Sequence, residues 1–282
     1  MSNKNIKKII FTDYTFNTFT NDWMGGDILN GKVWEPHITE FLKINLNSTS
    51  TFIDIGSNYG WHSIHSSKMC HKILSFEPQK ILFEIQKQNI EDNKIDNIDL
   101  FNCGVGEINE IKYMTPINYE DESLNYGDLS VNGNSDKNGE KIEIKKLDSI
   151  KIENVDIIKI DVQGYEKFVV LGAQEIIKKH KPIFIVEIES HQLRKFNYNP
   201  SELYGLFRDL GYYIFLLDYH YPSDCVCVHK DNIVKFREKN KENIFELIES
   251  NNISDCLENG VTEKIYYNDE IKYNSKKYEI IG

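Results

Sequence analysis

The stretch Thr51-Phe-Ile-Asp-Ile-Gly-Ser-Asn-Tyr-Gly-Trp61 decides how this sequence folds. Its first five residues are typical of a buried strand, with Asp54 as the only charge. Gly56 and Gly60 then predict a tight turn, because glycine adopts backbone conformations that other residues avoid. A helix is expected to begin near Trp61. In this order of elements, the N–H groups of the turn and the helix N-terminus can approach a ligand.

The polar residues of this turn indicate the kind of ligand. The spacing is DxGxNxG and not the GxGxxG of dinucleotide-binding folds, since Asp54 precedes the first glycine and Asn58 replaces the second. An acid at this point suits a ligand that carries an amino group. A plain tight turn between buried elements is the alternative.

A second acid follows the next predicted strand. The apolar run from Lys72 to Phe76 ends in Glu77-Pro78. An acid at the end of the second strand can accept hydrogen bonds from both ribose hydroxyls of an adenosine. The alternative is a surface glutamate ahead of a helix that begins with proline.

A third polar group lies in the apolar strand from Val155 to Ile160. This strand carries Lys159 and Asp161 towards the carboxyl edge of the sheet, where ligands of open α/β folds bind. A buried lysine needs a charged partner, and Asp161 or Glu166 can supply it. A purely structural ion pair is the alternative.

Around these motifs, near-continuous apolar strands alternate with helical segments. This alternation is typical of a parallel sheet with helices on both faces. Further strands are expected at 98–102 and 182–188, helices at 81–93, 165–179 and 232–250, a hairpin at 111–114 and 141–144, a strand pair at 212–217 and 225–228, and a polar hairpin-like tail after 250.

One large core with two flanking segments is the expected domain organisation. Residues 1–50 are expected to form a helical cover, residues 51–230 the core with an insertion at 108–146, and residues 231–282 a helix and a small β appendage. The polar stretch 118–140 is long for a loop in a compact domain, which favours a substrate lid. Four aromatic residues are expected to surround an acceptor together with this stretch: Trp23, Trp34, Tyr219 and Tyr221.

Taken in order, the motifs resemble the FkbM family of methyltransferases. The resemblance lies between residues 31 and 230 and rests on DIGSNYG at 54–60, FEP at 76–78, LDSI at 147–150, IIKIDVQGYE at 157–166 and KPIFIVEIE at 181–189. It implies a Rossmann-like class I methyltransferase fold of the α/β class. Such a fold has a mostly parallel seven-stranded sheet with one antiparallel strand. The implied cofactor is S-adenosylmethionine, and the implied acceptor is a hydroxyl of a sugar, a glycan or a glycosylated small molecule.

The resemblance also assigns roles to residues of this chain. Those expected to contact the cofactor are Asp54, Gly56, Ser57, Asn58 and Gly60 at its methionine part, Glu77 at the ribose, and Cys103 and Gly104 beside the adenine. The chain departs from the family at Gln163, where Glu is usual, and at Ser57, where Ala is usual. No catalytic role is therefore assigned to position 163.

Methyl transfer to an alcohol needs a base for the hydroxyl proton. Asp161 is the first candidate, with Lys159 keeping it ionised. The next candidates follow the neighbouring strand, namely Glu187, Glu189 and His191, and His62 is a weaker one. Carboxylates on adjacent strand ends can hold Mg²⁺ or Ca²⁺, but without a dense acidic cluster we expect no metal.

Composition narrows the classes of function. The net charge is −11 and basic residues are interleaved with acids, so we expect no nucleic-acid partner. The sequence has no apolar stretch of membrane-spanning length and no CxxC pair, which favours a cytoplasmic protein without a membrane partner. Homo-oligomerisation stays open. Two other classes remain, a nucleotide-dependent oxidoreductase and a non-catalytic cofactor-binding or structural protein.

Overall fold

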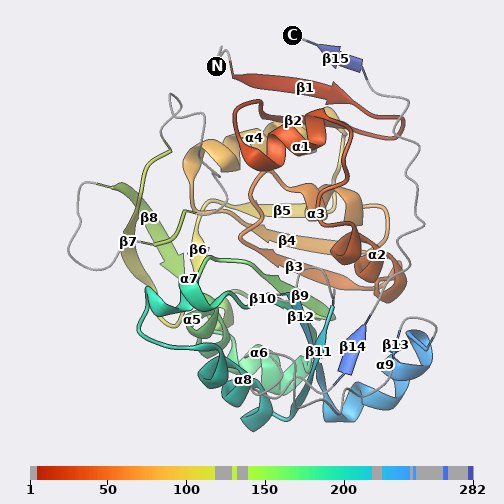
Figure 1. Cartoon of the computed structure of the whole chain (residues 1–282), viewed down its shortest axis with the longest axis vertical. Helices are drawn as coiled ribbons and strands as arrows, with labels where there is room; N and C mark the ends of the chain where they lie inside the picture. The colour runs from red at the N-terminus through yellow and green to blue at the C-terminus, as the bar shows by residue number, and fades with distance from the viewer. Residues whose placement is uncertain are drawn as a thin grey trace.

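Seven strands side by side form the centre of the molecule (Figure 1). In spatial order they are β5 (Ile98–Phe101), β4 (Lys72–Phe76), β3 (Thr51–Ile55), β9 (Ile157–Ile160), β10 (Ile183–Glu187), β12 (Asp224–His229) and β11 (Tyr212–Leu216). Among these seven, every neighbouring pair is parallel except the two pairs that include β12. The predicted seven-stranded sheet with one antiparallel strand is confirmed.

The computed structural model describes residues 5–117, 129–131, 139–217 and 224–241, and the backbone of three short strands closer to the C-terminus. Two of those strands, β14 (Glu263–Ile265) and β13 (Ile244–Phe245), extend the sheet beyond β11. In the described residues, no helix is long and apolar enough to cross a membrane.

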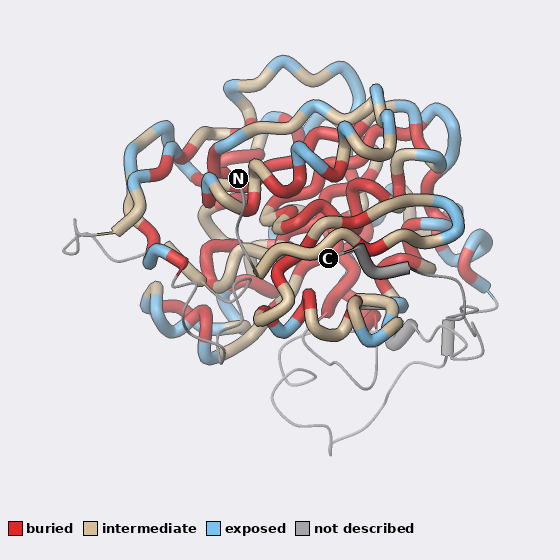
Figure 2. The backbone as a smooth tube through the Cα atoms, turned by 90° about the horizontal axis from the view of Figure 1, so that it is seen from above, coloured by how far each residue is buried: buried red, intermediate tan, exposed pale blue. Residues whose placement is uncertain are grey.

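Helices cover both faces of the sheet because alternate strand residues point to opposite sides. On one face, Ile53 and Ile158 pack with α5 (Glu166–Leu171), α6 (Gln174–His180) and α8 (Pro200–Asp209). On the other face, Phe52 and Ile157 pack with α2 (Pro36–Asn45) and α9 (Ile233–Lys239). Figure 2 shows the central strands as buried along most of their length.

The N-terminal segment is not the purely helical cover that the sequence predicts. It contains α1 (Trp23–Leu29) and α2, but it begins with an antiparallel hairpin of β1 (Ile6–Ile10) and β2 (Thr15–Phe19), and β1 also pairs with β15 (Glu279–Ile281). The hairpin lies against α4 (Lys80–Asp92), where Asn89 and Asn93 exchange hydrogen bonds with the β2 backbone. These long-range side-chain contacts leave no periodic pattern in the sequence.

The insertion after β5 forms a small sheet of its own. Its strands are β6 (Gly104–Val105), β7 (Glu110–Met114) and β8 (Glu140–Lys145), and the pairing of β7 with β8 confirms the predicted hairpin. Most of the polar stretch 118–140 lies outside the described residues. Its residues 129–131 lie near β7, where Met114 and Val131 form a β-bridge.

Two predicted helices differ from their expected extent. The segment 165–179 is broken into α5 and α6, and Gly172 lies at the break, where a Cβ would lie 1.9 Å from the carbonyl oxygen of Gly106. Asp148, in the short helix η2 (Leu147–Ser149), then caps α6 by accepting two of its backbone N–H groups. In the described part of 232–250, the helical residues belong to η3 (Lys230–Asn232) and α9, which ends at Lys239. The side chain of the C-cap residue Asn240 bonds that of Asn45.

Candidate active site

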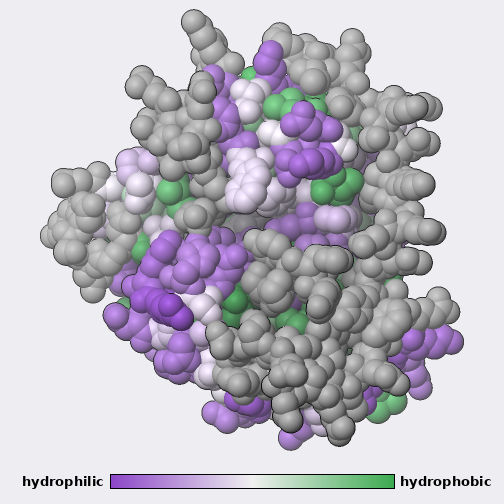
Figure 3. Space-filling view, viewed as in Figure 1, coloured by the Kyte–Doolittle hydropathy of each residue, from purple (hydrophilic) through white to green (hydrophobic). Residues whose placement is uncertain are grey.

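A cavity of about 430 Å³ lies at the carboxyl ends of β3, β4 and β9. Among the described residues, its wall carries six carboxyl side chains and one lysine: Asp27, Glu35, Asp54, Glu77, Asp161, Glu187 and Lys159. A cleft lined mainly by one sign of charge attracts the opposite charge, so this wall favours a cationic ligand. Figure 3 shows mainly hydrophilic described residues over α1 and over α7 (Ser190–Arg194), with the surface hollowed between them.

The backbone N–H groups of the turn after β3 make hydrogen bonds within the protein. The N–H groups of Gly56 and Ser57 donate to the carbonyl oxygen of Phe76 at 3.0 and 3.1 Å, and that of Gly60 donates to the carbonyl oxygen of Ser57 at 2.8 Å. Gly56 has φ of +81°, and a Cβ there would lie 1.8 Å from the carbonyl oxygen of Asp161. The expectation that these three N–H groups face a ligand is therefore wrong, and Gly56 is required by backbone geometry and close packing.

Asp54 has one oxygen held by the fold and one without a partner. Its Oδ2 accepts a hydrogen bond from the Ser63 hydroxyl at 2.6 Å. Its Oδ1 is buried and has no hydrogen-bond partner among the described residues, although Asp54 lines the cavity. A buried charged oxygen without a partner is costly, so this atom suits the amino group of a ligand.

A chain of side-chain hydrogen bonds runs behind the turn. The Ser63 and Ser75 hydroxyls lie 3.0 Å apart, and Gln86 bonds Ser75 at 2.6 Å and Ser57 at 2.8 Å. Gly60 packs on the same glutamine, since a Cβ at Gly60 would lie 2.6 Å from it, and it is not part of the cavity wall. Ser57 thus anchors the turn, which accounts for the hydroxyl at this position.

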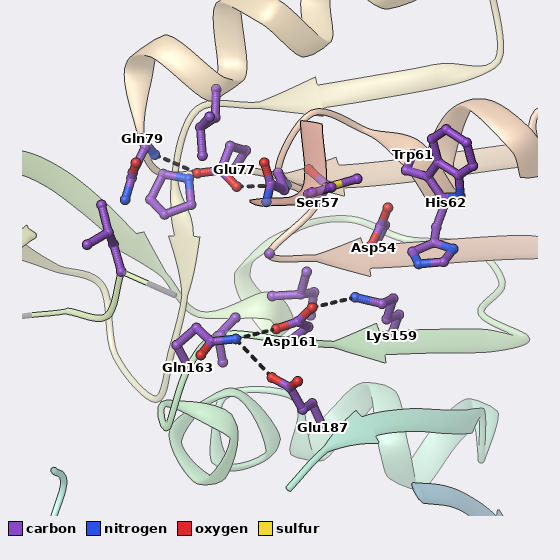
Figure 4. A pocket seen from close by; sticks show the side chains of 18 of the residues that line it. Asp54, Ser57, Trp61, His62, Glu77, Gln79, Lys159, Asp161, Gln163 and Glu187 are labelled. Atoms are coloured by element: carbon purple, nitrogen blue, oxygen red, sulfur yellow. Dashed lines mark hydrogen bonds and ion pairs between the residues drawn. The ribbon is translucent and has the colours of Figure 1, made fainter. Parts of the chain in front are cut away.

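Glu77 joins the turn to the end of β4 and also lines the cavity. Its Oε2 accepts from the N–H of Asn58 at 2.9 Å and its Oε1 from the N–H of Gln79 at 2.8 Å (Figure 4). Burial raises the pKa of Glu77 to about 8, although the two N–H groups oppose this. Each carboxylate oxygen has a second lone pair, so Glu77 can still accept from hydroxyls of a ligand.

The end of the cavity beside Gly104 is apolar. Its described wall there includes Pro78, Leu82, Val105, Met114, Leu129, Val131 and Ile144. Gly104 lines this part, as expected for a residue beside an adenine. Cys103 does not, because it points into the core, where burial raises the pKa of its thiol to about 11.

Lys159 and Asp161 form the predicted ion pair, with Nζ and Oδ2 2.9 Å apart. Burial alone would lower the pKa of Lys159, but the neighbouring carboxylates, Asp161 first, raise it. Gln163 donates to Asp161 Oδ1 at 3.0 Å and to Glu187 Oε2 at 2.9 Å (Figure 4). Glu166, the other partner considered for Lys159, instead accepts from backbone N–H groups of the loop after β9.

Two of the candidate bases lie away from the cavity. Of the acids after β10, Glu187 lines it, whereas Glu189 and His191 do not. The chain turns at Glu189 into α7, and this turn carries His191 outward, with 66% of its side chain exposed. Since neither residue reaches the cavity, neither stands as the base.

Two histidine–carboxylate pairs at the cavity were not predicted as pairs. His62 Nε2 lies 2.7 Å from Glu35 Oε2, and His37 Nε2 lies 2.5 Å from Asp224 Oδ2. Burial opposes ionisation of Glu35, but Lys159 and His62 outweigh it and lower its pKa to about 2. Burial raises the pKa of Asp224 to about 6, against the effect of His37. The partners come from segments without a recognisable motif, so the sequence carries no signal for them.

The rim of the cavity is partly aromatic. Trp23 and Trp34 both line it, and Trp23 is 67% exposed. The other two aromatic residues expected at an acceptor, Tyr219 and Tyr221, lie outside the described residues. Within residues 5–117, 129–131, 139–217 and 224–241, no group of three or more metal-ligating side chains could hold a metal ion.

Comparison with known proteins agrees with this geometry. The sequence model of the methyltransferase FkbM domain matches residues 54–214, more than half of the chain. The chain belongs to the FkbM methyltransferase family. The match runs from Asp54 to the middle of β11 and so includes both the turn and the Lys159–Asp161 pair. A search of curated proteins gives no match.

Solved structures of similar proteins include a methyltransferase FkbM from Methylobacillus flagellatus, 18% identical, with a TM-score of 0.42 over 64% of this chain. This chain spans 44% of that protein's length. A protein from Streptococcus mutans described as a methyltransferase, in complex with SAH, is 11% identical, with a TM-score of 0.43 over 68% of this chain and 94% of that one. An rRNA methylase from Streptococcus thermophilus is 13% identical, with a TM-score of 0.42 over 68% of this chain and 93% of that one.

Proposed function

We propose that this FkbM methyltransferase transfers the methyl group of S-adenosylmethionine to a hydroxyl of a sugar, a glycan or a glycosylated small molecule. The observation that carries the proposal is the pair of acids at the ends of β3 and β4. Asp54 offers a buried oxygen that no described residue contacts by a hydrogen bond, and Glu77 offers a carboxyl group at the same cavity. One acid suits an amino group and the other suits a ribose.

The cavity wall fits this cofactor along its length. Asp54 would accept from the methionine ammonium, Glu77 from the ribose hydroxyls, and the apolar wall beside Gly104 would pack on the adenine. Buried Asn58 Oδ1 and Gln79 Oε1 also have no partner among the described residues, so each can accept from the ligand. When bound, the cofactor supplies an activated methyl group on a positively charged sulfur, which the surplus of acids in the wall favours.

The other end of the cavity supports a sugar acceptor. Trp23 and Trp34 offer aromatic faces at the rim, and such faces pack well on apolar C–H surfaces. Lys159 and Asp161 line the same cavity as a charged donor and acceptor at the end of β9, where they can hold hydroxyls. Holding the acceptor in line with the methyl group supplies much of the rate acceleration.

Product analysis with an isotopically labelled methyl group tests this function. Wild-type protein would be incubated with labelled S-adenosylmethionine and a panel of free sugars, sugar nucleotides and oligosaccharides, and the products analysed by mass spectrometry. We expect the label on an oxygen of a sugar. Label on a nitrogen or a carbon, or transfer to RNA and to no sugar, would contradict the proposal.

A further inference from the structure

His62 and Glu35 form a buried pair at the cavity wall that the cofactor does not account for. The two side chains lie 2.7 Å apart and are 6% and 15% exposed. Both residues line the cavity. His62 is the second residue of α3 (Trp61–Ser66), whereas Glu35 precedes α2, so the pair joins two elements at the acceptor end of the cavity.

The backbone of Glu35 adopts an unfavourable conformation, which indicates that the surrounding structure holds this residue in place. Glu35 has φ of 43° and ψ of 63°, a left-handed conformation that is unfavourable for a residue with a side chain. Its side chain makes no cap bond to α2, although it is the N-cap residue. Strained residues of this kind are concentrated at functional sites. Because of this strained backbone, the carboxylate of Glu35 points away from its own helix and contacts His62.

The contact with Glu35 determines which nitrogen of His62 carries the proton. A carboxylate only accepts hydrogen bonds, so Nε2 must be the donor. In a neutral ring, Nδ1 then keeps its lone pair. Nδ1 is buried and has no hydrogen-bond partner among the described residues. His62 thus lines the cavity and carries a buried acceptor that no described residue uses, in a ring oriented by a carboxylate.

Asp161, the other candidate base, already has hydrogen-bond partners. Its two carboxylate oxygens already accept hydrogen bonds, one from Lys159 at 2.9 Å and one from Gln163 at 3.0 Å. Both oxygens of Asp161 are thus held by the protein, whereas Nδ1 of His62 has no partner among the described residues. Figure 4 shows Asp161 between these two partners and His62 on the other side of Asp54.

We propose that His62, oriented by Glu35, is the base that removes the proton of the acceptor hydroxyl. This inference rests on the proposed function. As the bond between the acceptor oxygen and the methyl carbon forms, the bond from that carbon to sulfur breaks and the hydroxyl proton passes to His62 Nδ1. The positive charge of the sulfonium is replaced by that of the imidazolium, which the Glu35 carboxylate stabilises.

Asp161 and Glu35 then have different roles from His62. Asp161, with Lys159, holds neighbouring hydroxyls of the acceptor and so acts on its binding. Glu35 is a positioning residue, because it acts on the reaction only through the imidazole.

The first test measures directly which ring nitrogen of His62 carries the proton, and it needs no methyl acceptor. The ¹⁵N chemical shifts of histidine rings distinguish the nitrogen that carries a proton from the one that does not, and His62→Gln assigns the signal of His62. We expect the proton on Nε2 in the wild type and loss of this preference in Glu35→Gln. A neutral His62 ring with its proton on Nδ1 would overturn the proposal, whether or not any sugar is methylated.

The second test separates proton removal from binding. His62→Gln keeps an amide donor for Glu35 and removes the base, so kcat for the sugar panel should fall by about 100-fold or more, while the Kd for S-adenosylhomocysteine changes less than about threefold. Asp161→Asn should mainly raise KM. An unchanged kcat in His62→Gln, or a loss confined to cofactor affinity, would overturn the proposal.

The same helix provides a matched control. His65 lies one turn further along α3, its Nδ1 donates to the carbonyl oxygen of Trp61 at 2.7 Å, and it is not part of the cavity wall. We expect His65→Gln to leave kcat unchanged. A fall in kcat equal to that of His62→Gln would show that α3 is merely disturbed, and would overturn the proposal. If the wild type methylates no sugar, the proposed function fails, and the ring-nitrogen measurement still decides the state of His62.

Discussion

Two buried glutamates hold the loops at the edge of the sheet. Glu77 accepts the N–H groups of Asn58 and Gln79 after β4, and Glu166 accepts those of Val162 and Gly164 after β9. Burial raises the pKa of Glu77 to about 8 and that of Glu166 to about 7, against the effect of these N–H groups. Between the ordinary value of 4.5 and these raised values, both acids therefore hold a proton in the folded chain that they lose in the unfolded one.

This difference predicts how stability depends on pH. Between the ordinary value of 4.5 and the folded value of about 7, folded Glu166 binds more proton than unfolded Glu166. The free energy of unfolding should fall as the pH rises through this window, by on the order of 3 kcal/mol for this residue. Glu166→Gln keeps an acceptor for the two N–H groups and removes the titration. Urea unfolding at about pH 5 and about pH 8 should show a smaller difference in the variant.

Glu153 provides the control for this measurement, because it is exposed. Glu153→Gln should leave the difference between the two pH values as it is in the wild type. An equal pH dependence in wild type and Glu166→Gln would contradict the account of Glu166 as a buried, protonated acid.

At the residue scale, the sequence predicts the acids that follow strands and misses those that reach the site from elsewhere. Asp54, Glu77 and Asp161 were predictable because the end of an apolar strand in a parallel sheet lies at the ligand-binding edge. Glu35 was not predictable, because its role depends on a left-handed backbone and on a partner 27 residues away. His191 was misplaced because the turn into α7 reverses the direction that the strand sets.

At the scale of elements, Gln86 connects α4 to the turn after β3. It bonds Ser57 and Ser75, and its side chain occupies the space beside Gly60. Gln86→Leu should fill this space but remove one hydrogen bond from each of two buried hydroxyls, at a cost of about 0.5–1.5 kcal/mol for each. Ser57 keeps its bond to the carbonyl oxygen of Phe76, and Ser75 keeps its contact with Ser63. Thermal unfolding should occur at a lower temperature, and the affinity for S-adenosylhomocysteine should fall because the turn loses its anchor.

Gln88 lies on the exposed side of the same helix, and its side chain donates to Asp92 Oδ1 at 2.9 Å. We expect Gln88→Leu to change the unfolding temperature and the affinity for S-adenosylhomocysteine much less than Gln86→Leu does. If Gln86→Leu and Gln88→Leu lose the same stability and affinity, the hydrogen bonds of Gln86 are not what keeps the turn after β3 in place.

Helix boundaries at this scale were harder to predict than helix positions. The break between α5 and α6 depends on the contact of Gly172 with the backbone of Gly106 and on the cap from Asp148. The sequence shows continuous helical periodicity there, and both contacts are made by residues distant along the chain. The hairpin of β1 and β2 was missed for the same reason, since Asn89 and Asn93 supply its hydrogen bonds from α4.

At the scale of the whole molecule, the cavity is lined by three parts of the chain. The strand ends of the sheet provide Asp54, Glu77 and Lys159, the N-terminal segment provides Trp34 and Glu35, and the insertion after β5 provides an apolar wall that includes Met114 and Ile144. The parallel sheet with helices on both faces follows from the alternation of apolar strands and helices and was predictable. The closure by the N-terminal segment was not, because it depends on tertiary contacts alone. We therefore expect the acceptor to contact residues that the family motifs do not include.

Calorimetric titration of S-adenosylhomocysteine into the wild type and into Asp54→Asn tests the central claim most directly. The substitution keeps the shape and an acceptor for Ser63, and removes the charge that the amino group of the ligand would contact. We predict that the wild type binds one ligand per chain and that Asp54→Asn binds at least about tenfold more weakly, a loss of about 1.4 kcal/mol. Circular dichroism would confirm that both proteins are folded. Absence of binding by the folded wild type, or equal affinity in the two proteins, would contradict the account.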